Sequence, residues 1–211
     1  TKAGQINLNV SANDTMVTAN SFSISAGFDD LVFNQSPLIT LRTPNGALTA
    51  TNVSMPAGDV TGRFPPFCCA GLTYQPLPVT LRASGDLVVS NYTRAAGSQA
   101  KSTTFQSDSG SVTLGTVSGN LDSMTVSAST DATVTSLSTA GFVQINASTG
   151  NIAVNSVTSS GSGVTMNANN GVIGAINDGP GVEITASGAV NLSANRVGSA
   201  GFTNPLDIAG N

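Results

Sequence analysis

Apolar and polar residues alternate in short runs along this chain, and the runs recur about every 20 residues. The alternation is clearest from Ser109 onward, in runs such as 112–114 (VTL), 143–145 (VQI) and 164–166 (VTM). A period of two is typical of a β-strand with one buried face. Because each run is too short to be stable alone, the recurrence predicts a stack of coils in which every strand pairs with the coils before and after it.

The pattern predicts that residues 1–211 form one all-β unit, a parallel β-helix (β-solenoid) with about 20 residues and two such runs in each coil. We expect stacked strands about 4.8 Å apart, with Val, Ile, Leu and Met inside and Thr, Ser and Asn outside. Crossover chirality favours a right-handed coil. Further runs lie at 6–10, 22–24, 31–33, 39–41, 53–55, 79–81, 87–89, 124–126, 152–154, 182–184, 190–192 and 206–208.

Two segments interrupt the alternation. Residues 92–106 are polar and predict a longer side excursion. Residues 62–78 contain four of the nine prolines, and proline cannot donate to a central ladder, so they predict a loop that protrudes from the stack or covers one of its flanks. Either this is a binding loop that contacts a neighbouring molecule, or it is a hydrophobic flap packed on its own coil. The side chains for an interaction are Phe64, Phe67, Cys68, Cys69 and Tyr74.

The two cysteines of the chain, Cys68 and Cys69, are adjacent. A disulfide between neighbours closes a strained ring, because normal Cα separations exceed what adjacent residues easily allow. Two free or buried thiols are therefore favoured over a vicinal disulfide, and an intermolecular bond is the third alternative.

Composition restricts the classes of function. Charged residues make up 9% of the chain, against about 25% in typical globular proteins, while 39% of the residues are apolar and regularly spaced. This combination favours ordered β-structure over disorder. The net charge is −4 and the seven Lys and Arg residues are scattered, which argues against nucleic-acid binding. No apolar run approaches the ~20 residues of a membrane span. No segment resembles a signal peptide, so we expect a mature chain or a segment of a longer one.

The sequence offers no arrangement for catalysis, a cofactor or a metal. Histidine is absent, which excludes the Ser-His-Asp and Cys-His arrangements. Phosphate-binding loops, dinucleotide fingerprints and calcium-binding nonapeptides are also missing. The eleven acidic residues are spread along the chain, with Asp178 and Glu183 as the pair most able to approach each other. The Thr-rich stretch at Thr133 and Thr135 does not recur at one place in successive coils, as an ice-binding face would require.

Three motifs resemble those of a known family. Residues 84–89 (SGDLVV), 149–154 (TGNIAV) and 187–192 (SGAVNL) resemble the repeats of filamentous haemagglutinin-like exoproteins, the secreted partners of bacterial two-partner secretion systems. Residues 21–35 and 43–48 are faintly similar to the N-terminal secretion domain of that family. The resemblance covers residues 80–211 best. It implies a right-handed β-helix, secretion, and a role in adhesion or in a surface fibre, and it brings no catalytic residues.

We therefore expect a non-enzymatic, extracellular structural or adhesive β-solenoid: a fibre subunit, or a segment of a large secreted adhesin at the bacterial cell surface. The alternative from another class is a polysaccharide-degrading β-helix enzyme or tailspike-like depolymerase, and an ice-binding protein ranks third. The expected partners are other copies stacked end to end or neighbouring solenoid coils. A host surface or a carbohydrate is the candidate ligand.

Overall fold

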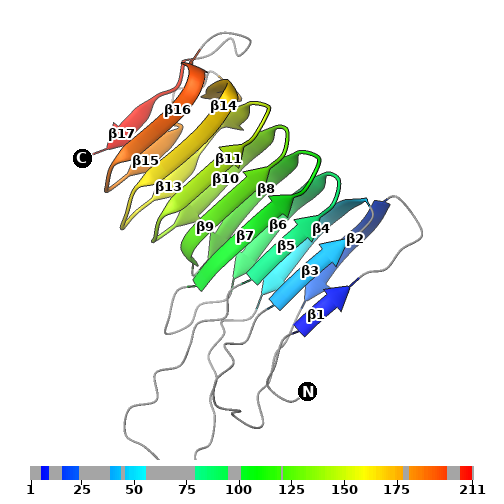
Figure 1. The fold of residues 1–211 in the computed structure, drawn as a ribbon. Helices are drawn as coiled ribbons and strands as arrows, with labels where there is room; N and C mark the ends of the chain where they lie inside the picture. Colours follow the sequence, from blue (N-terminus) through cyan, green and yellow to red (C-terminus); the bar gives the residue numbers. More distant parts are fainter. Residues whose placement is uncertain are drawn as a thin grey trace, which may run out of the picture.

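The chain folds as an all-β parallel β-solenoid in the computed structural model (Figure 1), which confirms the predicted fold class. The structure describes residues 6–9, 16–23, 39–43, 46–55, 79–94, 101–119, 121–177, 181–198 and 205–210. Within these ranges there is no helix, and so no apolar helix long enough to cross a membrane. All the strand pairings are parallel, and the strands belong to one continuous sheet that coils on itself. The predicted right-handedness stays a prediction.

Among the described residues, seventeen strands make up this sheet. In chain order they are β1 (Ile6–Asn9), β2 (Met16–Ser23), β3 (Ile39–Thr43), β4 (Ala47–Met55), β5 (Val79–Ala83), β6 (Leu87–Arg94), β7 (Lys101–Ser107), β8 (Val112–Gly119), β9 (Leu121–Ala128), β10 (Ala132–Thr139), β11 (Val143–Ala147), β12 (Ile152–Val154), β13 (Val157–Ser159), β14 (Val164–Ala175), β15 (Ile184–Ala186), β16 (Val190–Val197) and β17 (Ile208–Gly210).

The strands stack in three parallel ladders rather than the two runs per coil that the sequence predicts. Ladder A contains β1, β3, β5, β7, β9, β11 and the first parts of β14 and β16. Ladder B contains the first halves of β2, β4, β6, β8 and β10, followed by β12 and the last parts of β14 and β16. Ladder C contains the second halves of the same five strands, followed by β13, β15 and β17.

The number of residues in a turn is the sequence distance between residues that lie side by side on neighbouring strands of ladder A. From β5 to β16, the residues that follow one another in this way are Val79, Thr103, Met124, Val143, Val164 and Val190. The regular turns between Thr103 and Val164 therefore take about 20 residues, as predicted, and the turns on either side are longer. The solenoid takes about 24 residues per turn, somewhat more than the sequence predicts.

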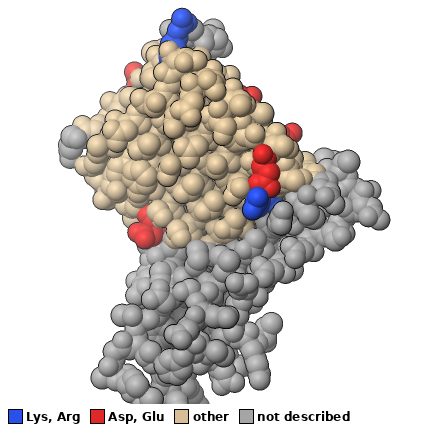
Figure 2. Space-filling model, in the orientation of Figure 1, with Lys and Arg blue, Asp and Glu red and all other residues tan. Residues whose placement is uncertain are grey.

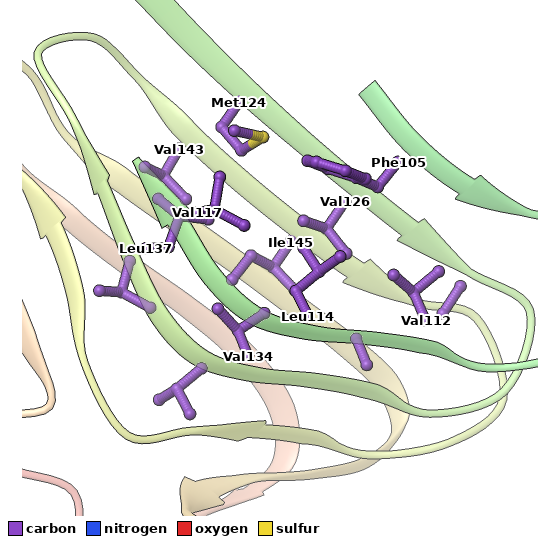
Figure 3. Packing of buried hydrophobic residues seen from close by; sticks show 14 of the residues in the cluster. Phe105, Val112, Leu114, Val117, Met124, Val126, Val134, Leu137, Val143 and Ile145 are labelled. Atoms are coloured by element: carbon purple, nitrogen blue, oxygen red, sulfur yellow. The ribbon is translucent and has the colours of Figure 1, made fainter. Parts of the chain in front are cut away.

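The core consists of inner columns, in which one buried side chain of each turn packs on its equivalents in the neighbouring turns (Figure 3). Ladder A carries one such column through Leu81, Phe105, Val126, Ile145 and Met166, each 0% exposed. Full burial of an aliphatic side chain contributes about 1.5–3 kcal/mol. The core therefore runs along the axis of the stack instead of forming one central cluster.

A hydrogen-bonded column of Asp and Asn side chains lines the corner that leads into ladder B. Asp86 Oδ1 accepts a hydrogen bond from the backbone N–H of Ser111 at 2.7 Å, and Asp131 Oδ1 accepts one from the N–H of Asn151 at 2.7 Å. Asn151 Oδ1 in turn accepts from the N–H of Val172 at 2.9 Å. Each of these bonds gives a corner N–H a partner in the neighbouring turn and so joins the two turns.

The residue before each of these corner donors is glycine, and its missing side chain makes room for the carboxylate or amide. A Cβ built on Gly150 would meet Asp131 Oδ1 and would lie 2.7 Å from the carbonyl carbon of Thr130. The glycines before Ser111, Asn151 and Val172 therefore have a steric explanation: only glycine leaves space for the acceptor from the preceding turn.

We predict that Gly150→Ala lowers the free energy of unfolding by about 1–3 kcal/mol, because the added methyl group must displace Asp131 or the backbone of Thr130. Urea unfolding followed by far-UV circular dichroism measures this change. Gly181→Ala is the matched control, because a Cβ there would meet nothing within 4 Å. Equal stabilities of the two variants would contradict the steric role of Gly150.

Candidate functional site

The predicted interaction loop at residues 62–78, with Phe64, Phe67, Cys68, Cys69 and Tyr74, lies outside the described residues. The described chain stops at the end of β4 and resumes with β5 at Val79. On ladder A, β5 pairs with β3, with Val79 beside Ile39. The role of the loop as a contact, and the state of its cysteines, stay predictions.

Most of the described acidic residues hold one turn of the solenoid to the next. Asp86 and Asp131 accept hydrogen bonds from backbone N–H groups at the corner into ladder B. Glu183 is buried, and its Oε2 accepts a hydrogen bond from the backbone N–H of Asp207 at 2.7 Å. No group of three or more His, Cys, Asp or Glu residues that could hold a metal ion occurs in the described ranges. Asp178, the predicted neighbour of Glu183, lies outside them.

An exposed ion pair links two neighbouring turns on ladder A. Arg82 Nε donates hydrogen bonds to Asp108 Oδ1 and Oδ2 at 2.9 and 3.0 Å, and Gln106 Nε2 donates to Asp108 Oδ1 at 2.9 Å. Arg82 and Gln106 are register partners on β5 and β7. Exposed pairs of this kind contribute little, typically 0–1 kcal/mol. Arg82, Gln106 and Asp108 therefore link the surfaces of two turns with little effect on stability, and they do not form a binding site by themselves.

Elsewhere charged side chains are few: the view in Figure 2 shows a small number of Lys, Arg, Asp and Glu side chains on the described part, with one cationic group lying against an acidic one. One outer column of ladder A is rich in threonine, which sequence reasoning missed. The column reads Thr80, Thr104, Thr125, Gln144, Thr165 and Asn191. The signal was present in the sequence, as the middle residue of each alternating run on this ladder.

A polar cluster inside the core occupies the segment for which the sequence predicts a side excursion, 92–106. Instead, β6 and β7 bring Tyr92, Thr103 and Phe105 into the interior, where they are at most 1% exposed. The Tyr92 and Thr103 hydroxyl groups are 3.2 Å apart, and the Tyr92 ring meets Phe105 edge to face at 5.1 Å. Arg94, 1% exposed, lies at the end of β6. For residues 92–94 and 101–106 the prediction was wrong, because hydroxyl groups that bond each other can take inward positions. Residues 95–100 lie outside the described residues.

Burial determines the ionisation of this cluster. It raises the pKa of Tyr92 above its ordinary value of 10.0, and the hydrogen bond with Thr103 and the charge of Arg94 only partly offset the effect. Burial also lowers the pKa of Arg94, which the neighbouring Tyr92 partly offsets. A hydroxyl that resists ionisation and has a partner for its hydrogen bond suits a structural role.

The last turn exposes apolar side chains that earlier turns bury. Val197 at the end of β16 and Ile208 in β17 are each 45% exposed, whereas their register partners Ile173 and Ile184 are 0% exposed. On ladder A, Val190 and Leu192 are only partly buried against the core. Among the described residues, this end of the stack therefore carries two of the four large apolar side chains that are exposed.

Comparisons of the chain with protein-family models, with curated proteins and with solved structures find no match. The fold is therefore assigned from the strand pairing itself: a β-solenoid whose turns average about 24 residues, without a family assignment.

We predict that alkaline pH destabilises the chain through Tyr92. Because the folded state raises the pKa of this group above 10.0, its stabilising contribution is complete below pH 10.0 and is lost as pH rises from there toward the folded pKa. Tyr92→Phe keeps the ring and removes the ionisation, so its free energy of unfolding should fall less steeply above pH 10.0. At neutral pH the variant should be about 1 kcal/mol less stable, since the Thr103 hydroxyl loses its partner.

Urea unfolding at neutral pH and at several values above pH 10.0 measures both effects. Thr103→Val is the matched control, because it removes the same hydrogen bond and leaves the ionisable tyrosine in place. If Tyr92→Phe and the unmodified protein show the same pH dependence, Tyr92 is not the group responsible.

Proposed function

We propose that this chain is an extracellular structural or adhesive element, either a fibre subunit or a segment of a larger secreted bacterial adhesin. The observation that carries the proposal is the continuity of three in-register ladders from β1 and β2 to β16 and β17. Such a stack holds its outer surface in a fixed, repeating arrangement over its whole length. A repeating outer surface is suited to many similar contacts along another surface, whereas catalysis needs a single site.

The acidic residues support the same proposal by the contacts they make. A polysaccharide-degrading enzyme needs carboxylates that converge on a substrate groove. Here Asp86 and Asp131 bond to the backbone of the following turn, Asp108 is paired with Arg82, and Glu183 bonds to the backbone at Asp207. These acids are engaged in holding turns together.

The outer columns are the surface that we propose to adhere. Thr104, Thr125 and Thr165 lie in the same column of ladder A with Gln144, so hydroxyl and amide groups repeat at the spacing of neighbouring strands, about 4.8 Å. Each group can donate and accept hydrogen bonds, and many weak contacts made together give strong attachment. A carbohydrate coat or a host surface offers partners of this kind. Secretion to the cell surface is supported by the resemblance of the Gly-Asp and Gly-Asn repeats to filamentous haemagglutinin-like exoproteins.

We predict that the purified chain binds surfaces without modifying them. Beads coated with the chain should be retained on cells or on immobilised glycans, and incubation with a panel of polysaccharides should release no reducing or unsaturated sugar ends. Beads coated with urea-unfolded chain of the same composition are the control, because unfolding removes the repeating columns. Release of sugar ends from any polysaccharide would overturn the proposal in favour of a depolymerase, and absence of retention on every surface would remove the adhesive role.

A further inference from the structure

The C-terminal turn of the solenoid presents a free edge. β16 pairs with β14, and β17 pairs with β15, each on one side. No strand among the described residues pairs with the other side of β16 or β17. Their outward N–H and C=O groups are therefore available for the pairing that joins the turns to each other elsewhere in the stack.

The inner columns are left open at the same edge. Ala194 on β16 is partly buried, and its partner Ala168 in the preceding turn is 0% exposed. Val197 and Ile208, each 45% exposed, likewise stand at inner positions of the stack, and no described strand pairs with their outer side. A partner that binds this edge must supply parallel strands, and it must place apolar residues at the spacing of the inner columns.

The opposite end of this chain supplies strands in the required arrangement. The outer edges of β1 and β2 are likewise without a partner in the described ranges. Their backbone register places apolar residues in the same columns: Ile6 and Leu8 in the columns of Val190 and Leu192, Val17 in that of Val197, and Phe22 in that of Ile208.

We propose that the C-terminal edge, formed by β16 and β17, binds the N-terminal edge, formed by β1 and β2, of a second copy of this chain. The joint continues the parallel pairing of all three ladders and covers Val197 and Ile208. It rests on the proposed function as a fibre element and specifies how the fibre grows. Because the two surfaces differ and the operation does not close, each addition recreates the same free edge, and the product is a filament.

A head-to-tail joint agrees with the register better than a symmetric one. Two C-terminal edges related by a two-fold axis would run antiparallel across the joint on ladder A, unlike the parallel pairing inside the stack. The head-to-tail joint places Asn7 beside Asn191, because both occupy the outer column of ladder A that contains Thr80 and Thr104.

The first experiment places charge in the open inner columns of the full chain. Val197→Lys combined with Ile208→Lys should weaken association about tenfold or more, because a lysine ammonium group cannot be buried between stacked turns without a partner. Thr125→Lys adds charge to the outer column of ladder A in the middle of the stack, away from both edges, and is the matched control, expected to assemble like the unmodified chain. Sedimentation velocity over a concentration series measures the association, and electron microscopy shows the filaments.

Circular dichroism and thermal unfolding establish that each variant is folded before the comparison. Filaments that weaken only in the double variant support the proposal. An unmodified chain that stays monomeric at all concentrations overturns it, as do filaments that the double variant forms equally well. Failure to assemble leaves the adhesive proposal intact, because retention on surfaces is measured with beads coated with single chains.

The second experiment tests the register of the joint. With Cys68 and Cys69 replaced by Ser, we combine Asn7→Cys with Asn191→Cys, two positions that adjacent parallel strands bring within disulfide distance, about 4.4–6.8 Å between Cα atoms. Oxidation should give a ladder of dimers, trimers and longer species on a non-reducing gel, and each single variant should give none. A dimer formed by Asn191→Cys alone would indicate a symmetric joint and overturn the head-to-tail arrangement.

Discussion

Parallel, in-register pairing between successive turns is the interaction on which the rest of this structure depends. Each strand is only three to twelve residues long, so its backbone groups and its apolar side chains must both be satisfied by the turns above and below. A slip of one residue would turn every inward side chain outward, because side chains alternate along a strand. Hydrogen bonding and apolar burial thus specify the same register, and neither could be changed without the other.

Much of the fold could be predicted from the sequence because ladder A alternates clearly. The runs 124–126, 143–145 and 164–166 pair with one another as expected. Ladder C could not be predicted in the same way, because its strands bury one large apolar residue each, such as Leu137 and Val157, and a single residue has no period. The predicted turn length holds only in the central turns, where no extra residues separate the ladders.

The candidate sites were harder to predict than the fold, because each depends on contacts between different strands. The acceptor role of Asp131 depends on the backbone N–H of Asn151, one turn further along, and the burial of Tyr92 depends on Thr103 and Phe105 of the following strand, β7. The residues next to Asp131 and Tyr92 in the sequence do not indicate which distant residues these side chains contact. The sequence does mark the corners by glycine, but the reason for the glycine is the carboxylate that arrives from the preceding turn.

The dependence of each turn on its two neighbours alone also determines how the molecule responds to mechanical load. A force that pulls the C-terminus away from the axis acts first on β17 and β16, and β15 and β14 keep their own partners until those strands have left. Turns then detach one after another, and each releases about 24 residues, or about 80 Å of extended chain. Such a solenoid absorbs work in small successive steps, which is a useful property in any element that tethers one surface to another.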